Sequence, residues 1–158
     1  WLAEAYPTAQ IYGIEPAPDR VQVASLALGT GGQVVRGRAP DLPPGPEGAD
    51  GAFMLDMMHF LSDAQLILTL QRLHARLADG APLTIRAVMV PQRRAAWYWW
   101  IDIFRNRLSG VETHWRPVEH IESLLTQCGY QVRNMAPSGT NGDLLWVCAV
   151  RIKRDYNN

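Results

Sequence analysis

The sequence predicts an α/β fold with a mostly parallel sheet, helices on both faces and an antiparallel hairpin at the carboxyl end. Three observations predict it. Short β-branched and aromatic runs alternate with segments of helical periodicity, the run at 50–56 is almost continuously apolar, and only the residues PSGTNG join the last two runs. Continuous apolar strands are typical of parallel sheets buried on both faces, whereas a short connection allows antiparallel pairing.

The composition indicates one globular domain over residues 1–158. The chain is 47% hydrophobic and carries 15 basic and 15 acidic side chains, so we expect neither disorder nor the net positive field that recruits nucleic acid. The longest apolar runs, 95–101 and 144–150, are far shorter than the ~20 residues that cross a bilayer. We therefore expect no nucleic-acid partner and no membrane span.

The two cysteines and four histidines limit the other classes of site. Cys128 and Cys148 cannot form a disulfide framework, which favours a reducing compartment and hence the cytoplasm. The histidines do not show metal-ligand spacing, and we predict no metal site. The sequence also lacks the motifs of covalent catalysis and phosphoryl transfer.

The first third of the chain predicts two strands around one helix. The run at 9–15 ends on the acidic Glu15, and a helix follows over 17–28, with proline and aspartate in its first turn and glycines at its end. A second strand covers 33–37. The segment 39–50 is too rich in proline and glycine for a helix, so we expect a loop there.

The strand at 50–56 is followed by the clearest helix of the sequence. Ser62 and Gln65 have the spacing of a capping box, and leucines recur on one face of the segment after them. Gly80 stands where we expect the left-handed residue that ends this helix. Both signals are local, so they predict the element without knowledge of its neighbours.

The second half predicts one strand, two helices and the closing hairpin. A strand over 82–90 is followed by a tryptophan-rich helical segment, and a second helix covers 117–128. The strands at 130–136 and 143–152 then form the hairpin.

Polar residues at strand ends are the main functional signal. Ligands of parallel α/β sheets bind outside the carboxyl ends of the strands, which is where Glu15, Arg38 and Asp56 are expected. The carboxylate of Glu15 could bind a ribose diol or be a solvated charge at a helix start. Asp56 could orient a ligand or accept backbone hydrogen bonds. His59, three residues further, could act as a general base or be structural.

The tryptophan-rich segment allows three interpretations. Its apolar stripe fits an ordinary packed helix, a lid over an apolar substrate or an interfacial membrane anchor. Tyr98 and Trp99 fall off that stripe and need another place to bury, which favours a lid or a partner surface. We expect residues 92–116 to form a cap.

Several phrases, in the right order, resemble a class I S-adenosylmethionine (SAM)-dependent methyltransferase from its first crossover helix onward. They are IYGIEPAPDRVQVAS, VVRGRAPDLP, DGAFMLDMMHFLSD, LHARLADGAPLTIRAV, and IESLLTQCGYQV with DLLWVCAV. The resemblance implies a Rossmann-like fold and SAM as the cofactor. It implies that Glu15 holds the ribose, that Pro16, Arg38 and Ala39 border the adenine, and that Asp56 lies beside the methyl donor.

Two departures from that family matter. The chain begins inside what would be the first helix, without Met, so the first strand and the glycine-rich motif are absent and we expect upstream residues to be missing. We therefore expect a central vacancy between the strands at 9–15 and 50–56, filled by a strand-completing segment or closed by direct pairing. Arg38 also stands where many members have an acid that accepts from the adenine amine.

The resulting prediction is methyl transfer from SAM to a small, apolar molecule. His59 is the candidate base, and Met58, Tyr98 and Trp99 are the candidate substrate pocket. Two alternatives remain: a non-catalytic methyltransferase-like module for binding or assembly, and an NAD-dependent oxidoreductase, whose ribose also suits Glu15. A homodimer is the alternative to a lid for the tryptophan-rich segment.

Overall fold

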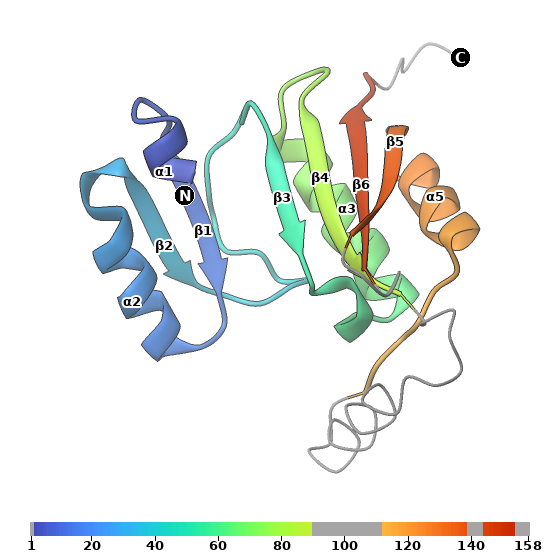
Figure 1. The fold of residues 1–158 in the computed structure, drawn as a ribbon, viewed down its shortest axis with the longest axis horizontal. Helices are drawn as coiled ribbons and strands as arrows, with labels where there is room; N and C mark the ends of the chain where they lie inside the picture. The colour runs from blue at the N-terminus through green and yellow to red at the C-terminus, as the bar shows by residue number, and fades with distance from the viewer. Residues whose placement is uncertain (1, 90–111, 139–143, 154–158) are drawn as a thin grey trace. The chain divides into compact units, whose positions relative to one another are not determined.

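The computed structural model describes residues 2–89, 112–138 and 144–153. The chain divides into two compact units, Trp1–Pro46 and Glu47–Asn158, which we describe separately (Figure 1). Their strands form two sheets, one of two strands and one of four. The expectation of one domain over 1–158 remains a prediction.

The first unit begins with a short helical turn, which is followed by a strand, a helix and a second strand. Its two strands pair in parallel, and the register places Glu15 beside Arg36. The helix begins with proline, and a 3₁₀ turn at the predicted glycines ends it. The elements are α1 (Leu2–Ala5), β1 (Ile11–Glu15), α2 (Pro18–Leu28), the 3₁₀ turn η1 (Gly29–Gly31) and β2 (Gly32–Arg36).

The predicted loop after β2 packs onto β1. The Tyr12 hydroxyl donates a hydrogen bond to the carbonyl of Pro44. A Cβ at Gly45 would approach the Tyr12 ring to 2.8 Å, so a larger residue there would displace the ring or the loop. The loop conformation expected for 39–50 is confirmed, because no helix or extended strand forms over these residues.

The second unit is a four-stranded mixed sheet with two helices. Its strand order is β3-β4-β6-β5, with β3 parallel to β4 and the other pairs antiparallel (Figure 1). The closing hairpin is thus confirmed, and the fold is mixed α/β as predicted. The elements are β3 (Ala52–Leu55), the 3₁₀ turn η2 (Met58–Phe60), α3 (Asp63–Arg76), β4 (Pro82–Val88), α5 (Val118–Gln127), β5 (Tyr130–Ser138) and β6 (Leu144–Arg151).

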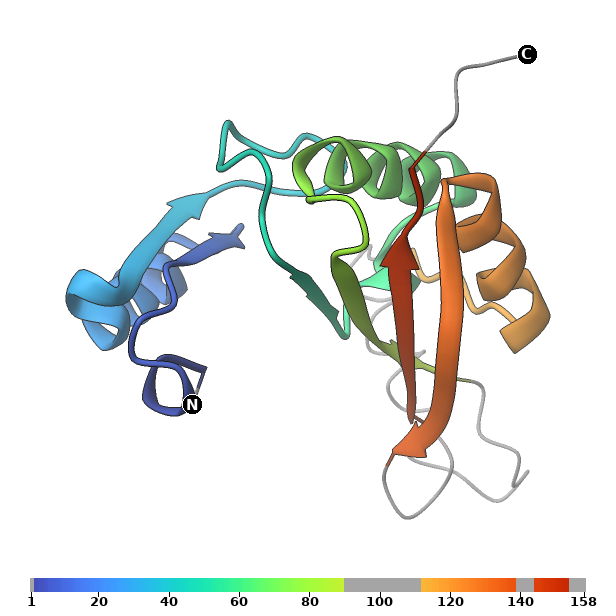
Figure 2. The ribbon, with the colours of Figure 1, turned by 90° about the horizontal axis from the view of Figure 1, so that it is seen from above.

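One face of this sheet carries the core. Alternate strand residues point into it and are fully or almost fully excluded from solvent, and α3 and α5 pack on that side (Figure 2). The buried strand residues are Met54, Leu83, Ile85, Ala87, Val147 and Ala149. On the opposite face of β3, Phe53 and Leu55 are 53% and 47% exposed. The described helices of this unit therefore cover one face only.

The amino end of α3 agrees with the prediction from the sequence, and its carboxyl end differs from it. The side chain of Ser62 accepts from the backbone N–H of Gln65 at 3.3 Å, and Gln65 accepts from the N–H of Ser62 at 2.9 Å, which confirms the capping box. The helix ends at Arg76, with an extended Leu77 after it. Gly80 has the expected positive φ of 77°, but it forms the turn into β4 and is not the helix cap.

Within the described residues, no strand of the first sheet pairs with a strand of the second. Most of the predicted cap, including Tyr98 and Trp99, lies outside the described residues. Within the described part of the chain, no helix is long and apolar enough to cross a membrane.

Candidate functional site

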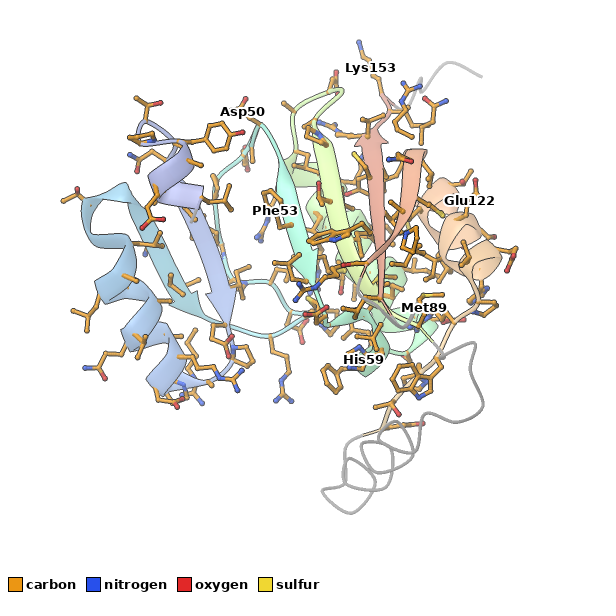
Figure 3. The ribbon with its side chains drawn as sticks, in the orientation of Figure 1. Asp50, Phe53, His59, Met89, Glu122 and Lys153 are labelled. Carbon is orange, nitrogen blue, oxygen red and sulfur yellow. The ribbon has the colours of Figure 1, made fainter. Side chains whose placement is uncertain are left out.

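The candidate site in the second unit lies at the carboxyl end of β3. Asp56 follows the strand with a φ of 53°, a left-handed conformation that aspartate tolerates better than most residues. This conformation turns the chain from β3 into the 3₁₀ turn that carries His59. Figure 3 shows His59 at that end of the sheet, while Asp50 lies at the opposite end of β3. The position matches the general rule for ligand sites in α/β sheets.

His59 is buried between aromatic rings. It is 8% exposed, its ring stacks on Trp115 with 5.4 Å between centroids and 9° between planes, and Phe60 lies against it at 3.9 Å. Its Nδ1 is enclosed and has no hydrogen-bond partner among the residues that the structure describes. Burial lowers the pKa of His59 below its ordinary value; Asp56 opposes this shift and the positive charge of Arg116 adds to it. Burial thus favours the neutral form of the imidazole.

Asp56 is held by a cation on the neighbouring strand. Arg86 of β4 donates from Nε to its Oδ1 at 2.8 Å and from Nη2 to its Oδ2, a two-point ion pair. The backbone N–H of Asp56 also donates to the Arg86 carbonyl at 2.9 Å. The guanidinium lies 5.5 Å from the centre of the Trp146 ring. The carboxylate is therefore oriented by the protein, which neither interpretation from the sequence anticipated.

Arg116 connects the His59 turn to the segment before α5. Its side chain donates to the carboxylate of Asp63 at the start of α3 and to three carbonyls, those of Met58, Leu61 and His114. His120 of α5 binds the other oxygen of Asp63 at 2.8 Å. These hydrogen bonds lower the pKa of the Asp63 carboxyl below its ordinary value.

The first unit holds the other predicted cofactor residues. Glu15 ends β1, and its Oε1 accepts from the backbone N–H of Ala17 at 3.0 Å, which orients the carboxylate. Its backbone carbonyl accepts from the N–H of Gly37 at 3.1 Å, so the ends of β1 and β2 are tied together. Pro16 and Arg38 are exposed, and Ala39 is buried. Each unit thus contains its own part of the predicted site.

The remaining predicted residues are placed as follows. Met58 is buried in the core, and its carbonyl accepts from Arg116. Its predicted role in a substrate pocket remains a prediction, as do those of Tyr98 and Trp99. Within the described ranges, no group of three or more histidine, cysteine or acidic side chains is placed to hold a metal ion.

Three residues of the site were missed in the sequence. Arg86 carries a detectable signal, because a lone cation inside the apolar strand run LTIRAV calls for a partner. Trp115 and Arg116 lie in a stretch without periodicity, and Arg116 mainly binds backbone carbonyls, which any residue type provides. Local pattern therefore gave no means to find these two.

No known protein-family profile matches the sequence, and no curated protein matches it. Solved structures do match. Mitomycin 7-O-methyltransferase MmcR aligns with a TM-score of 0.75 over 95% of this chain and 44% of its own, at 20% identity. A SAM-dependent methyltransferase from Mesorhizobium loti aligns with a TM-score of 0.73 over 90% of this chain and 81% of its own, at 18% identity.

This chain has the fold of SAM-dependent methyltransferases. The pyocyanin biosynthetic protein PhzM aligns in the same way, with a TM-score of 0.71 over 95% of this chain and 45% of its own, at 16% identity. The chain thus spans less than half the length of MmcR and of PhzM. Glu15 ends β1, and His59 lies in the 3₁₀ turn η2 that follows β3. These are two of the strands whose carboxyl ends were predicted to hold ligands.

Proposed function

We propose that this chain forms part of a methyltransferase that transfers a methyl group from SAM to a small, apolar molecule. The observation that carries the proposal is the pairing of the methyltransferase fold with a buried imidazole in the turn after β3, where burial lowers the pKa of the ring. The similarity to MmcR, an O-methyltransferase, supports a hydroxyl as the methyl acceptor.

The residues of the first unit fit a bound nucleoside. The Ala17 N–H holds Oε1 of Glu15, and no contact within the described part of the chain occupies Oε2. A carboxylate with an open oxygen suits the two hydroxyls of a ribose. In this proposal Pro16, Arg38 and Ala39 border the adenine. Because Arg38 cannot accept a hydrogen bond, contact with the adenine amine falls to backbone carbonyls near Ala39.

In the second unit, His59 is the proposed general base. When bound, SAM would supply a methyl group from its sulfonium sulfur, which would leave as a thioether with the electron pair of the broken C–S bond. His59 takes the proton of the acceptor hydroxyl while the oxygen bonds to the methyl carbon, and the neutral imidazole required for this is the form that burial favours. Asp56, fixed by Arg86, forms the floor beside the reacting groups.

The proposal includes a partner segment and a location. β3 lies at the edge of its sheet with exposed apolar side chains, and such an edge accepts a further strand. A strand-completing segment or a second copy of the chain is the proposed occupant. Cys128 and Cys148 are both free thiols, which supports a cytoplasmic location.

The cofactor assignment is tested by calorimetry of SAM and of NAD with the full-length protein. We expect SAM to bind and NAD not to bind, and we expect weak or no SAM binding by residues 1–158 alone. Glu15→Gln should weaken SAM binding about tenfold, the effect of one lost charge-assisted hydrogen bond. Glu122→Gln, at an exposed position on α5, is the matched control. Tight NAD binding without SAM binding would reverse the assignment.

The role of His59 is tested with methyl-labelled SAM and 1-naphthol as a small, apolar hydroxy acceptor. His59→Gln should lower the turnover number about 10²- to 10⁴-fold while the dissociation constant of SAM stays unchanged. SAM binding without transfer to any hydroxylated acceptor, in the wild type as in the variant, would favour the alternative of a non-catalytic module.

A further inference from the structure

We propose that Arg116 is a positioning residue, whose guanidinium fixes the turn Met58–Phe60 and thereby the orientation of the His59 ring. The role assigned to that ring rests on the proposed function, but the positioning itself does not. Arg116 lies 57 positions after His59 in the sequence, and the two meet only in the folded chain.

The first argument is the set of atoms that the guanidinium binds. Arg116 is 6% exposed, and its Nη1 donates to the Met58 carbonyl at 2.9 Å while Nη2 donates to the Leu61 carbonyl. These carbonyls stand on either side of His59. Since the guanidinium is planar and its N–H groups have fixed directions, it sets the distance between the two carbonyls and so the curvature of the turn.

The second argument is that the neighbours of Arg116 hold His59 directly. The backbone N–H of His114 donates to the His59 carbonyl at 2.7 Å, and Trp115 stacks on the imidazole. Consecutive residues therefore fix the backbone, the ring face and the flanking carbonyls of the same turn. The stacking contact with Trp115 uses the face of the His59 ring and not its nitrogens.

The third argument is that stability alone explains this arrangement poorly. Removing a guanidinium from water is costly, and a buried ion pair is weak evidence of stabilisation. Here the ionic partner, Asp63, has a side chain that is 52% exposed, so the attraction is partly screened. Burial is the main cause of the lowered pKa of His59; the charge of Asp56 opposes this shift, and the charge of Arg116 adds to it. The guanidinium thus holds the geometry of the turn and adds to the effect of burial on the pKa of His59.

The test is NMR spectroscopy of the histidine rings in the full chain, for the wild type, Arg116→Met and Arg116→Lys. We expect Arg116→Met to abolish the nuclear Overhauser contact between the rings of His59 and Trp115 and to raise the pKa of His59. Arg116→Lys keeps the charge but cannot bridge the carbonyls, so it should weaken the ring contact while the pKa stays lowered. Arg133→Met, at an exposed position of β5, is the matched control.

His74 provides the internal reference. It is buried on α3 and lies edge-on to Tyr130, with 5.4 Å between ring centroids, away from the turn. A positioning role predicts that the His74 signals stay unchanged while those of His59 move. Unchanged His59 signals in a folded variant would overturn the proposal, and so would parallel changes at both histidines. If Arg116→Met does not fold, Arg116→Lys decides by the same criteria. None of these outcomes depends on methyl transfer.

Discussion

The two units share a local pattern but differ in what they bury. Both contain parallel strands joined through a helix on one face. In the second unit, many side chains are completely excluded from solvent, among them Leu66, Leu70, Leu83, Ile85, Leu125 and Val147. In the described part of the first unit, Ala39 is the only buried apolar residue, and Val23 and Leu26 of α2 are exposed. A correct alternation of strands and helices therefore does not by itself make a core.

The difference has a geometric cause. Two strands and one helix form a narrow interface, so most of their apolar side chains lie at its edge and contact solvent. Four strands packed against two helices enclose enough volume to bury side chains completely. The consequence concerns function, because the proposed ribose ligand Glu15 belongs to the thinly packed unit and the proposed base His59 belongs to the well-packed one. We expect the two units to differ in stability.

Hydrogen exchange should show the largest difference. Amides of β4 and β6 in the second unit should exchange only through global unfolding, whereas those of β1 and β2 should exchange through local opening, orders of magnitude faster. Mass spectrometry of exchanged fragments from residues 1–158 measures both in one sample. Equal protection of the two sheets would mean that the chain unfolds as one cooperative unit and would break the comparison.

A pair of matched leucine substitutions tests the same difference energetically. Leu70 is fully buried under the sheet and Leu26 is 77% exposed on α2. Leu70→Ala should lower the free energy of unfolding of the second unit by about 2–5 kcal/mol, and Leu26→Ala should change stability by about 0.5 kcal/mol or less. Urea unfolding followed by tryptophan fluorescence and circular dichroism measures both. Comparable losses would show that α2 buries Leu26 in solution.

The sequence predicted what depends on neighbours along the chain. The capping box of α3, the strand that ends on Glu15 and the closing hairpin were all found from local pattern, and the structure confirms them. The resemblance of short phrases to methyltransferases also predicted the fold. What local pattern could not reveal is contact between distant segments, such as Arg116 on the carbonyls around His59 or the exposure of Phe53 on β3. Such contacts and exposures depend on which elements pack against each other, and the periodicity of a single segment does not contain that information.

Removal of the α3 cap should have a smaller effect, confined to the second unit. Ser62→Ala deletes the side chain that accepts from the Gln65 N–H and should cost about 1 kcal/mol. Ser25→Ala, at an exposed position inside α2, is the matched control and should change stability by a few tenths of a kcal/mol at most. Chemical denaturation measures the free energy of unfolding of both variants. An equal loss in the two would show that the capping hydrogen bond of Ser62 does not stabilise the second unit.

The smallest expected effect is the pH dependence of the Asp63 contacts. His120 and Arg116 lower the pKa of this carboxyl in the folded chain, so folding favours its ionised form. Its contribution to stability is therefore fully present above the pKa of the unfolded chain, about 3.9, and is lost as the pH falls through the lower folded value. Because the side chain is half exposed, we expect a loss of about 1 kcal/mol or less.

Asp63→Asn isolates this contribution, with Asp19→Asn in the first turn of α2 as the matched control in the other unit. The free energy of unfolding, measured by urea titration at pH 7 and again at pH 3, should fall less in Asp63→Asn than in the wild type, because asparagine does not titrate. The control should keep the wild-type difference between the two pH values in the second unit. If the free energy of unfolding fell by the same amount in all three proteins, water would screen the charge of Asp63 completely. The contacts of Asp63 with His120 and Arg116 would then act as hydrogen bonds without a net ionic contribution.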